Sequence, residues 1–572
     1  MKNNELWFHS ILKVMYIFYF FIFLFLHLMF LFNGSFISNC YLLELSLFKL
    51  NTLDLDLFLI MDKYSLLFSS FIFIISSSVM LYSHIYMSIN ENTNRFIVMV
   101  NLFIMFMVIL VFMPNLIGVM IGWDGLGISS FILVIYYNNS MSLQSGLITV
   151  YTNRLGDVAI FFSIFYMYNY SMFMYDSYMF NSLMMFSFLL MLGGITKSAQ
   201  IPFVSWLPAA MAAPTPVSSL VHSSTLVTAG VYLFFRFYYM MEFYMLNLFM
   251  MWTSLLTSLL AGFIAYLEVD LKKMVAMSTL SQLGLMMFTL SLGELYFCYY
   301  HMVIHALFKA LLFLSCGVLI MYSYGGQDCR FMGSLSFMSP FIILLLIISN
   351  MSLIGFPFLS GFYSKDSILE AYSYNYSNIL VMFMLMLSCI MTFMYSINMV
   401  CYSINSIRMS VSVVNFIMNI KLIISMMMLF FWVIILGKIF FYLIFINTMY
   451  TINIIDKLMG LVIIIMGVLI FFTNNIMFMG FNMYMVNFFI SMGFMNWFFS
   501  GISMSYLVKN YSVIMLDSVW IELFNKFEVL NFMSYLNKNL INYYYIMKSI
   551  FMISLIVLLM WIIYLPFSLY KV

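Results

Sequence analysis

The sequence predicts an all-α polytopic membrane protein with roughly 16 transmembrane helices. Of its 572 residues, 65% are hydrophobic and only 7% are charged, and long apolar runs recur along the whole chain. A soluble domain carries about a quarter charged residues, because charge covers its surface. With a mean hydropathy of +1.08, the chain must have lipid as its main solvent.

Each predicted span is a run of about 20 apolar residues, the length that crosses the hydrocarbon core. The runs are continuous rather than alternating, and open sheets cannot cross lipid, so we expect helices. In chain order the runs lie near 11–32, 65–89, 96–113, 115–137, 147–169, 182–204, 214–238, 245–267, 273–292, 297–322, 335–359, 377–403, 421–446, 458–473, 476–500 and 548–569.

Two segments depart from this pattern. Residues 41–62 alternate apolar and polar side chains, which predicts a short extra-membrane hairpin. Residues 512–547 are too polar to span, and as a helix they would reach roughly 50 Å. A long helix along the membrane face is one interpretation of this segment, and a loosely structured connection is the other.

Charge and cysteine content exclude several function classes. The net charge of +2 leaves no basic surface for nucleic acid. The six cysteines form no C-x-x-C pair, so we expect no disulfide framework, iron–sulfur cluster or structural zinc in this chain. No transit segment or cleavage site marks the N-terminus, and the first run is expected to be a retained helix. The excess of Met and Tyr suggests an AT-rich organellar genome.

The informative residues are charges inside the apolar runs. Such a charge costs at least about 2.5 kcal/mol at the bilayer centre and usually lines a pathway. His301, His305 and Lys309 recur at i, i+4 and i+8, and therefore share one helix stripe. The other candidates are Asp124, Arg154, Asp157, Lys197, His222, Lys365 and Asp366.

Each candidate also has a purely structural interpretation. Asp124 could end a helix at an interface, and the i, i+3 pair of Arg154 and Asp157 could only stabilise its helix. His222 could be a hydrogen-bonded packing histidine. A metal pair at His301 and His305 is disfavoured, because no carboxylate or cysteine nearby completes the site. Lysines far from a span end cannot snorkel easily, which favours function at Lys197 and Lys309.

Proline placement marks two broken helices. Proline removes a backbone donor, and inside lipid the freed carbonyls are tolerated only where protein or water lines a cavity. The segments PFVS at 202–205 and PFLS at 357–360 resemble each other, and each has a lysine nearby. Paired interruptions of this kind predict a repeated transporter fold with sites near the midplane. A buried lysine whose acidic partner approaches or recedes is then a proton-binding switch, and histidines can relay between such lysines.

These motifs resemble a known family. GWDGLG, TNRLGDVA, the long run from TKSAQIPFVSW to STLVTAGVY, DLKKMVAMSTLSQLGLM, HALFKALLF and GFPFLSGFYSKD are similar to NADH–ubiquinone oxidoreductase chain 5, an antiporter-like subunit of mitochondrial respiratory complex I. The resemblance is dense over about 110–370. It implies two inverted five-helix repeats with discontinuous helices, a lateral helix, and proton pumping driven by distant redox chemistry.

The resemblance also assigns roles by motif. Asp124 and Lys197 would form an ion pair and proton site, which Arg154 and Asp157 would modulate. Asp124 stands where the family often has Glu, so its contact with Lys197 is expected to be longer or water-bridged. The central lysine would be Lys309, the relays His222, His301 and His305, and the exit pair Lys365 and Asp366.

The expected layout follows the same resemblance. It places N-terminal helices and the hairpin at 1–110, the two repeats at 111–270 and 271–410, further helices at 411–505, the lateral helix at 506–547 and a last span at 548–572. The chain would lie in the mitochondrial inner membrane as a subunit of an H⁺-translocating NADH:ubiquinone reductase. NADH, FMN, iron–sulfur clusters and ubiquinone would bind to partner subunits, and the partners here would be other complex I subunits and lipids.

Two rival hypotheses stay open. A stand-alone, Mrp-like cation/proton antiporter would need the same lysines and helix breaks. A non-pumping scaffold subunit would need only the lateral helix that holds its neighbours. Changes at the lysines would be silent in the scaffold, which distinguishes it from the two transporters.

Overall fold

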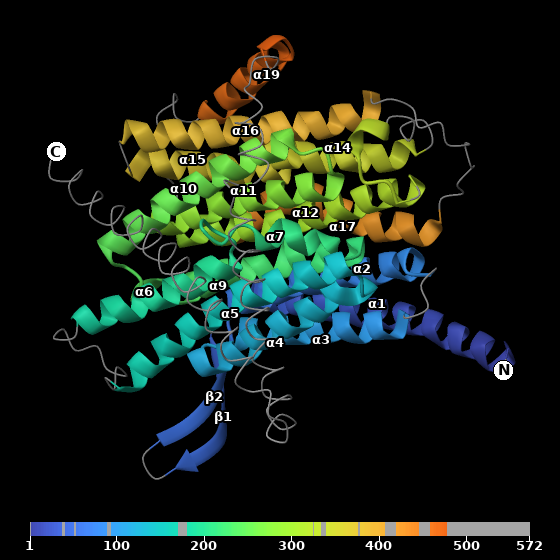
Figure 1. Ribbon diagram of the computed structural model, residues 1–572. Coiled ribbons are helices and arrows are strands. Elements are labelled where there is room, and N and C mark those ends of the chain that lie inside the picture. Colours follow the sequence, from blue (N-terminus) through green and yellow to red (C-terminus); the bar gives the residue numbers. More distant parts are fainter. Residues whose placement is uncertain are drawn as a thin grey trace, which may run out of the picture. The chain divides into compact units, whose positions relative to one another are not determined.

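The computed structural model describes residues 2–36, 40–50, 53–88, 93–169, 180–323, 325–332, 339–375, 378–405, 419–444 and 458–477. In these residues the chain is a set of α-helices packed side by side, with one β-hairpin (Figure 1). Ten of the described helices are long and apolar enough to cross a membrane. The predicted multi-pass membrane protein is thereby confirmed for this part of the chain.

The N-terminal part contains α1 (Lys2–Phe36), strands β1 (Tyr41–Leu50) and β2 (Leu53–Met61), and α2 (Lys63–Tyr86). The two strands are antiparallel, which confirms the hairpin predicted at 41–62, and they project away from the helices (Figure 1). Asp62 caps α2: its carboxylate accepts the Ser65 N–H at 2.9 Å, and Ser65 Oγ accepts the Asp62 N–H at 3.0 Å. This capping box fixes where the helix begins.

The next helices are α3 (Thr93–Phe112), α4 (Leu116–Val134) with the 3-10 turn η1 (Ile135–Tyr137), α5 (Ser140–Asn169) and α6 (Phe180–Lys197). The sequence predicted that the sixth span continues to residue 204, which is wrong. Helix α6 ends at Lys197, because Ala199 has a positive φ of 55° and Pro202 cannot continue the helix.

The first break follows. It comprises α7 (Trp206–Ala209), η3 (Ala210–Ala212), α8 (Thr215–Val217), the π-helix η4 (Ser218–Thr225) and α9 (Leu226–Arg236). Hydroxyls compete for the backbone carbonyls of η4: Ser223 Oγ donates to Ser219 O at 2.6 Å, and Thr225 Oγ1 donates to Leu220 O at 2.7 Å. Such bonds offer the backbone an alternative to the i, i+4 ladder, and π-turns occur frequently at functional sites.

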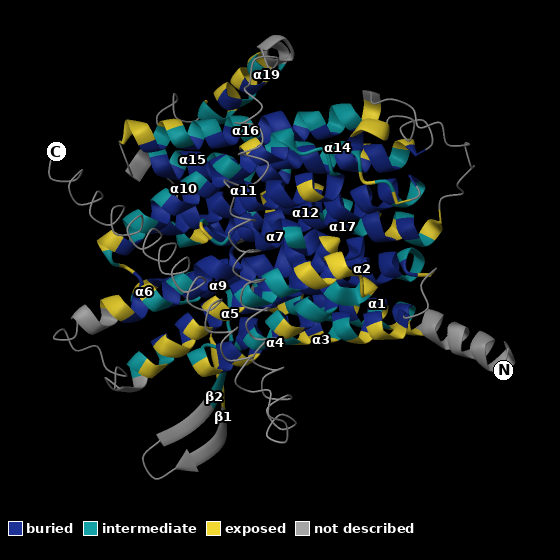
Figure 2. Ribbon diagram, in the orientation of Figure 1, coloured by how far each residue is buried: buried dark blue, intermediate teal, exposed yellow. Residues whose placement is uncertain are grey.

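Three long helices form the middle of the bundle. After the 3-10 turn η5 (Tyr238–Met240), they are α10 (Tyr244–Leu267), α11 (Leu271–Ser291) and α12 (Leu295–Tyr322), and the turn η6 (Cys329–Phe331) follows. Figure 2 shows α11 and α12 as buried along most of their length. The apolar window of α12 is 100% buried inside the protein, whereas that of α1 is 22% buried. Helix α1 therefore leaves apolar side chains such as Phe21 and Phe25 exposed on the surface of the described bundle.

A second break separates α14 (Pro340–Ile354) from α15 (Ser360–Asn375). The predicted span 335–359 is too long, because Gly355 (φ 89°) and Phe358 (φ 70°) adopt left-handed conformations and Pro357 lies between them. Helix α15 was not predicted as a separate element. The remaining described helices are α16 (Ile379–Asn405), α17 (Ile420–Ile444) and α19 (Met459–Met477).

The C-terminal predictions lie outside the described residues. They are most of the span 476–500, the lateral helix at 506–547 and the last span at 548–569.

Candidate functional site

Three helices bring the first group of charges together. Asp124 lies in α4, Arg154 and Asp157 lie in α5, and Lys197 is the last residue of α6. Together with Trp123 they form what we call the first cluster. Lys197 is fully buried, and the Asp157 side chain is 7% exposed, whereas Arg154 is 48% exposed.

The Lys197 ammonium contacts Trp123 rather than a carboxylate. Its Nζ donates to the Trp123 carbonyl at 2.6 Å and lies 3.9 Å from the centroid of the Trp123 ring. A carbonyl oxygen has two lone pairs, so it can accept from the lysine as well as from the helix. Both Asp157 and Asp124 act on Lys197 electrostatically without forming an ion pair within 4.0 Å of it.

Arg154 joins the two carboxylates. Its Nη1 lies 3.5 Å from Asp124 Oδ1 and 3.1 Å from Asp157 Oδ2. The resemblance implies an Asp124–Lys197 pair with a longer or water-bridged contact; in the structure the two form no ion pair within 4.0 Å, and Asp124 Oδ1 lies 3.5 Å from Arg154 Nη1.

Close packing of α5 on α6 places Asp157 near Lys197. A Cβ on Gly156 would overlap Thr196 Oγ1 and lie 3.2 Å from Gly193 O. Only glycine allows the two helices this approach. The residues that follow, Asp157 and Lys197, are therefore held at the same level of the bundle.

His222 is placed in the π-helix η4 and is buried. Its ring lies 6.4 Å from the ring of Trp206, whose Nε1 donates to Thr196 O at 3.0 Å. Both ring nitrogens of His222 lack a hydrogen-bond partner among the described residues. Thr196 precedes Lys197, so Trp206 links the first cluster to His222 through packing and one hydrogen bond.

The histidine stripe lies on α12, as the spacing predicted. His301, His305 and Lys309 are all fully buried, and the rings of the two histidines are 6.3 Å apart. His301 Nδ1 is 2.9 Å from Ser364 Oγ of α15, whereas both nitrogens of His305 lack a partner in the described part of the chain. Lys309 Nζ donates to Ser278 Oγ of α11 at 2.5 Å.

Lys365 reaches the same region from α15. Its Nζ donates to Leu353 O at the end of α14 and to Thr392 Oγ1 of α16 at 3.3 Å. Ser364, which contacts His301, directly precedes Lys365 on α15, so this helix brings Lys365 to the α12 stripe; we call His301, His305, Lys309 and Lys365 the second cluster. The carboxylate of Asp366 points elsewhere: a Cβ on Gly460 of α19 would overlap Asp366 Oδ1.

Sequence reasoning missed three polar partners. Trp123, Ser278 and Lys272 occur in the quoted motifs, but nothing in their spacing identified them. Lys272 Nζ is buried and donates at 3.2 Å to Ala213 O, directly before Pro214 in the first break. The sequence signal that could have found it is the pair of adjacent lysines, Lys272 and Lys273, because neighbouring helix residues point in different directions.

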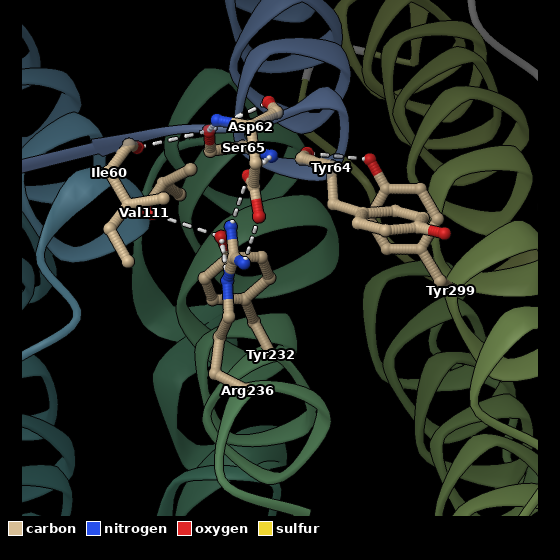
Figure 3. A network of polar contacts seen from close by, with 8 residues as sticks. All are labelled: Ile60, Asp62, Tyr64, Ser65, Val111, Tyr232, Arg236 and Tyr299. Atoms are coloured by element: carbon tan, nitrogen blue, oxygen red, sulfur yellow. Dashed lines mark hydrogen bonds and ion pairs between the residues drawn. The ribbon is translucent and has the colours of Figure 1, made fainter. Parts of the chain in front are cut away.

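A further network joins the hairpin to α9 (Figure 3). The guanidinium of Arg236 forms a bidentate pair with Asp62, with Nη2 to Oδ1 at 2.8 Å, and its Nε donates to Tyr232 Oη at 2.8 Å. Tyr232 Oη donates in turn to Val111 O at 2.9 Å. Burial alone would raise the pKa of the Asp62 carboxyl, but the bonds and charge of Arg236 hold that pKa below its usual value.

In the described residues, no group of three His, Cys, Asp or Glu side chains could hold a metal ion. The amines, imidazoles and carboxylates of the two clusters are groups that can bind and release protons. Broken helices that carry buried lysines at their interruptions are typical of transporters with sites inside the bundle. The fold and these sites define the class of antiporter-like membrane proteins.

Comparison with known families agrees with this class. Residues 113–392 match the family described as NADH:quinone oxidoreductase/Mrp antiporter, TM, and residues 47–97 match NADH-Ubiquinone oxidoreductase (complex I), chain 5 N-terminus. NADH-ubiquinone oxidoreductase chain 5 of Aedes aegypti is 48% identical over 365 residues, which are 63% of this chain and 63% of that protein. The protein of the same name from Anopheles arabiensis is 48% identical over 349 residues, 60% of this chain and 91% of that protein. The chain belongs to the NADH–ubiquinone oxidoreductase chain 5 family.

The match spans 63% of the length of the Aedes aegypti relative, so it does not cover that protein as a whole.

Solved structures resemble the fold. A chain of the Mrp complex from Dietzia sp. aligns with a TM-score of 0.68 at 22% identity, over 78% of this chain and 52% of that one. A chain of an archaeal membrane-bound sulfane sulfur reductase aligns with a TM-score of 0.66 at 17% identity, over 76% of this chain and 90% of that one.

Proposed function

We propose that this chain is a proton-translocating membrane subunit of NADH:ubiquinone oxidoreductase (complex I), placed in the mitochondrial inner membrane. The observation that carries the proposal is that Lys197, Lys309 and Lys365 are all buried and bonded to neutral carbonyl or hydroxyl oxygens. An ammonium without a fixed counter-ion can release and regain its proton when a nearby charge moves. Permanently paired lysines could not do so.

The first cluster would load the proton. Asp157 and Asp124 act on Lys197 from outside contact distance, and Arg154 holds both carboxylates. Movement of Arg154, which is half exposed, would free a carboxylate to approach the ammonium and favour its protonated form. Recession of the carboxylate would release the proton toward the middle of the bundle.

Buried hydroxyls and imidazoles would carry the proton onward. Gln200 Oε1, three residues past Lys197, accepts from Thr257 of α10 at 2.5 Å, and α10 packs on α11, which carries the Ser278 partner of Lys309. His222, His301 and His305 would relay protons through bound water, because unpartnered buried nitrogens are suitable places for it. Lys365, with Asp366 beside it, would form the exit side.

The same proposal includes the finer architecture. The two breaks, near Pro202 and Pro357, would be equivalent positions of two inverted five-helix repeats at 111–270 and 271–410, in a protein of roughly 16 spans. Both breaks contain a non-glycine residue with positive φ, Ala199 and Phe358, which supports the equivalence. The segments 1–110, 411–505, 506–547 and 548–572 would serve as flanking helices, a lateral helix and a last span.

Redox chemistry would take place on partner subunits. NADH, FMN, iron–sulfur clusters and ubiquinone would bind there, and this chain would contribute only proton movement to the enzyme. Neighbouring antiporter-like subunits along the lateral helix, and membrane lipids, would be its other partners.

The test is the proton-to-electron ratio of the assembled complex in sealed membranes. Lys197→Met and Lys309→Met are each expected to lower that ratio, whereas Lys438→Met, on the exposed face of α17, leaves it at the wild-type value. An unchanged ratio in both buried-lysine variants contradicts the proposal.

A second candidate is a cation/proton antiporter, favoured by the likeness to the Mrp complex and by the matched antiporter family. Sodium-driven proton exchange by this chain in vesicles without redox partners would support it. Proton movement that strictly requires NADH oxidation would exclude it.

A further inference from the structure

Trp123 makes three different contacts with the charges of the first cluster. Its carbonyl accepts from Lys197 at 2.6 Å, the Lys197 ammonium lies 3.9 Å over its ring, and its Nε1 donates to Asp157 Oδ1 at 2.9 Å. The side chain is fully buried. Trp123 is therefore in contact with both the amine and the carboxylate, which come from different helices.

The indole N–H restrains Asp157. A carboxylate has two oxygens, and here Oδ1 accepts from Trp123 while Oδ2 accepts from Arg154 at 3.1 Å. Both bonds fix the orientation of the carboxyl group, and hydrogen bonds to a carboxylate are about twice as strong as neutral ones. Asp157 is thus turned toward α4 and away from an ion pair with Lys197.

The ring and carbonyl restrain Lys197 in the same way. A cation over an indole face is stabilised by the ring quadrupole without a counter-ion. The ammonium therefore has a neutral resting place, and its charged neighbours Asp157, Asp124 and Arg154 stay outside contact distance of it.

We propose that Trp123 is a positioning residue that holds Lys197 on the face and Asp157 at the N–H edge of one indole, so that a proton moves only when these contacts are released. The proposal rests on the proposed function. In addition to the contact with Arg154, Asp157 must then also break its hydrogen bond to Trp123 before it reaches Lys197. Trp123 itself neither binds nor releases a proton.

The test uses the pH profile of proton pumping by the assembled complex. Trp123→Phe keeps an aromatic face under Lys197 and the backbone carbonyl but removes the N–H donor to Asp157. Losing one hydrogen bond to a charged group is expected to move the midpoint of the profile by about one pH unit. Trp432→Phe, an aromatic change beside His27 and remote from the first cluster, is expected to keep the wild-type profile.

A double-mutant cycle tests whether Trp123 acts on the pH profile through Asp157. In an Asp157→Ala background, Trp123→Phe is expected to cause no further change, because the bond it removes is already absent. Independent effects of the two changes, or a wild-type pH profile of Trp123→Phe, overturn the proposal. Trp123→His, which retains an aromatic ring and an N–H donor, is the second variant if Trp123→Phe does not assemble. The proposal requires that Trp123→His assembles and pumps. Failure of both variants overturns the proposal.

The result is separable from the proposed function. If Lys197→Met lowers the proton-to-electron ratio while Trp123→Phe is indistinguishable from wild type, only the role of Trp123 is refuted. If Lys197→Met leaves the ratio unchanged, the proposed function is refuted as well.

Discussion

Arg236 and Asp62 are 174 residues apart in the sequence and form a bidentate ion pair where α2 begins and α9 ends (Figure 3). Asp62 also caps α2, and Arg236 is the last residue of the helix that continues from the π-helix carrying His222. The pair therefore connects the base of the hairpin to the segment in which the first break lies. Both side chains are about one-fifth exposed, so solvent screens the pair only in part.

Asp62→Asn is expected to destabilise the protein by about 3 kcal/mol, because it leaves a largely buried guanidinium without its counter-ion. Thermal unfolding in detergent measures this change. The matched control is Asp328→Asn, which removes an exposed partner of Arg330 at 3.5 Å and should cost less than about 1 kcal/mol. Equal losses of stability in the two variants would show that the Asp62–Arg236 pair contributes no more than the exposed pair.

The contribution of the same pair depends on pH in a defined direction. Arg236 holds the folded-state pKa of Asp62 below its usual value. The stabilisation is therefore complete above the unfolded pKa of about 3.9 and is lost as the pH falls through the lower folded value. The difference in stability between wild type and Asp62→Asn should be constant from pH 7 to pH 5 and shrink below pH 4. A difference that instead shrinks toward high pH contradicts this assignment.

The second break depends on one glycine in close contact. A Cβ on Gly361, at the start of α15, would overlap Ser352 O of α14, and backbone cannot move aside as a flexible side chain can. Gly361→Ala is expected to cost more than about 2 kcal/mol, within the range of overpacked sites, and to separate Lys365 from Leu353 O. Gly127→Ala in α4 is the control, since nothing lies within 4 Å of its added Cβ, and it should be neutral or stabilising by about 0.5 kcal/mol. Unfolding midpoints of the two variants decide the matter.

Much of the described fold could be predicted from sequence because its signals are local. Apolar runs locate the spans, alternation locates the hairpin, and the i, i+4, i+8 spacing places His301, His305 and Lys309 on one helix. Helix ends at the breaks were predicted less well: α6 ends at Lys197 and α14 at Ile354, where single residues with positive φ decide the backbone.

The contacts inside the site could not be predicted in the same way. The partner of the Lys197 ammonium is the backbone carbonyl and ring of Trp123, and no residue spacing encodes a backbone acceptor on another helix. The Asp62–Arg236 pair likewise depends on packing between elements distant in sequence. Helix α15 escaped prediction because its polar residues, among them Lys365, Asp366 and Glu370, interrupt the apolar pattern.

Two adjacent lysines at the start of α11 provide a test variant and its control for the contact between α11 and the first break. Lys272 is buried and donates to Ala213 O at 3.2 Å, whereas Lys273 is 48% exposed and pairs with Asp270 at 2.9 Å. Lys272→Met leaves a buried carbonyl without this donor, which is expected to cost about 1–3 kcal/mol. Lys273→Met removes a surface pair worth at most about 1 kcal/mol. In thermal unfolding, Lys272→Met should therefore lose more stability than Lys273→Met. The reverse order would mean that the exposed Lys273–Asp270 pair contributes more to stability than the buried Lys272 hydrogen bond.

Ser278 is the hydrogen-bond partner of Lys309, and its removal tests whether that bond matters for the proposed proton pumping. Ser278 Oγ accepts from Lys309 Nζ at 2.5 Å and donates to Val275 O at 2.7 Å, so Ser278→Ala deprives a buried ammonium of an acceptor while changing little volume. A hydrogen bond to a charged group contributes about 1.5–3 kcal/mol, so we expect the pumping rate per NADH oxidised to fall about tenfold. The neighbouring Thr279→Val removes a hydroxyl that bonds only to Ala276 O of its own helix among the described contacts, and should leave pumping unchanged. Equal pumping by both variants, measured together with the NADH oxidation rate in sealed membranes, would mean that Lys309 does not use Ser278 during turnover.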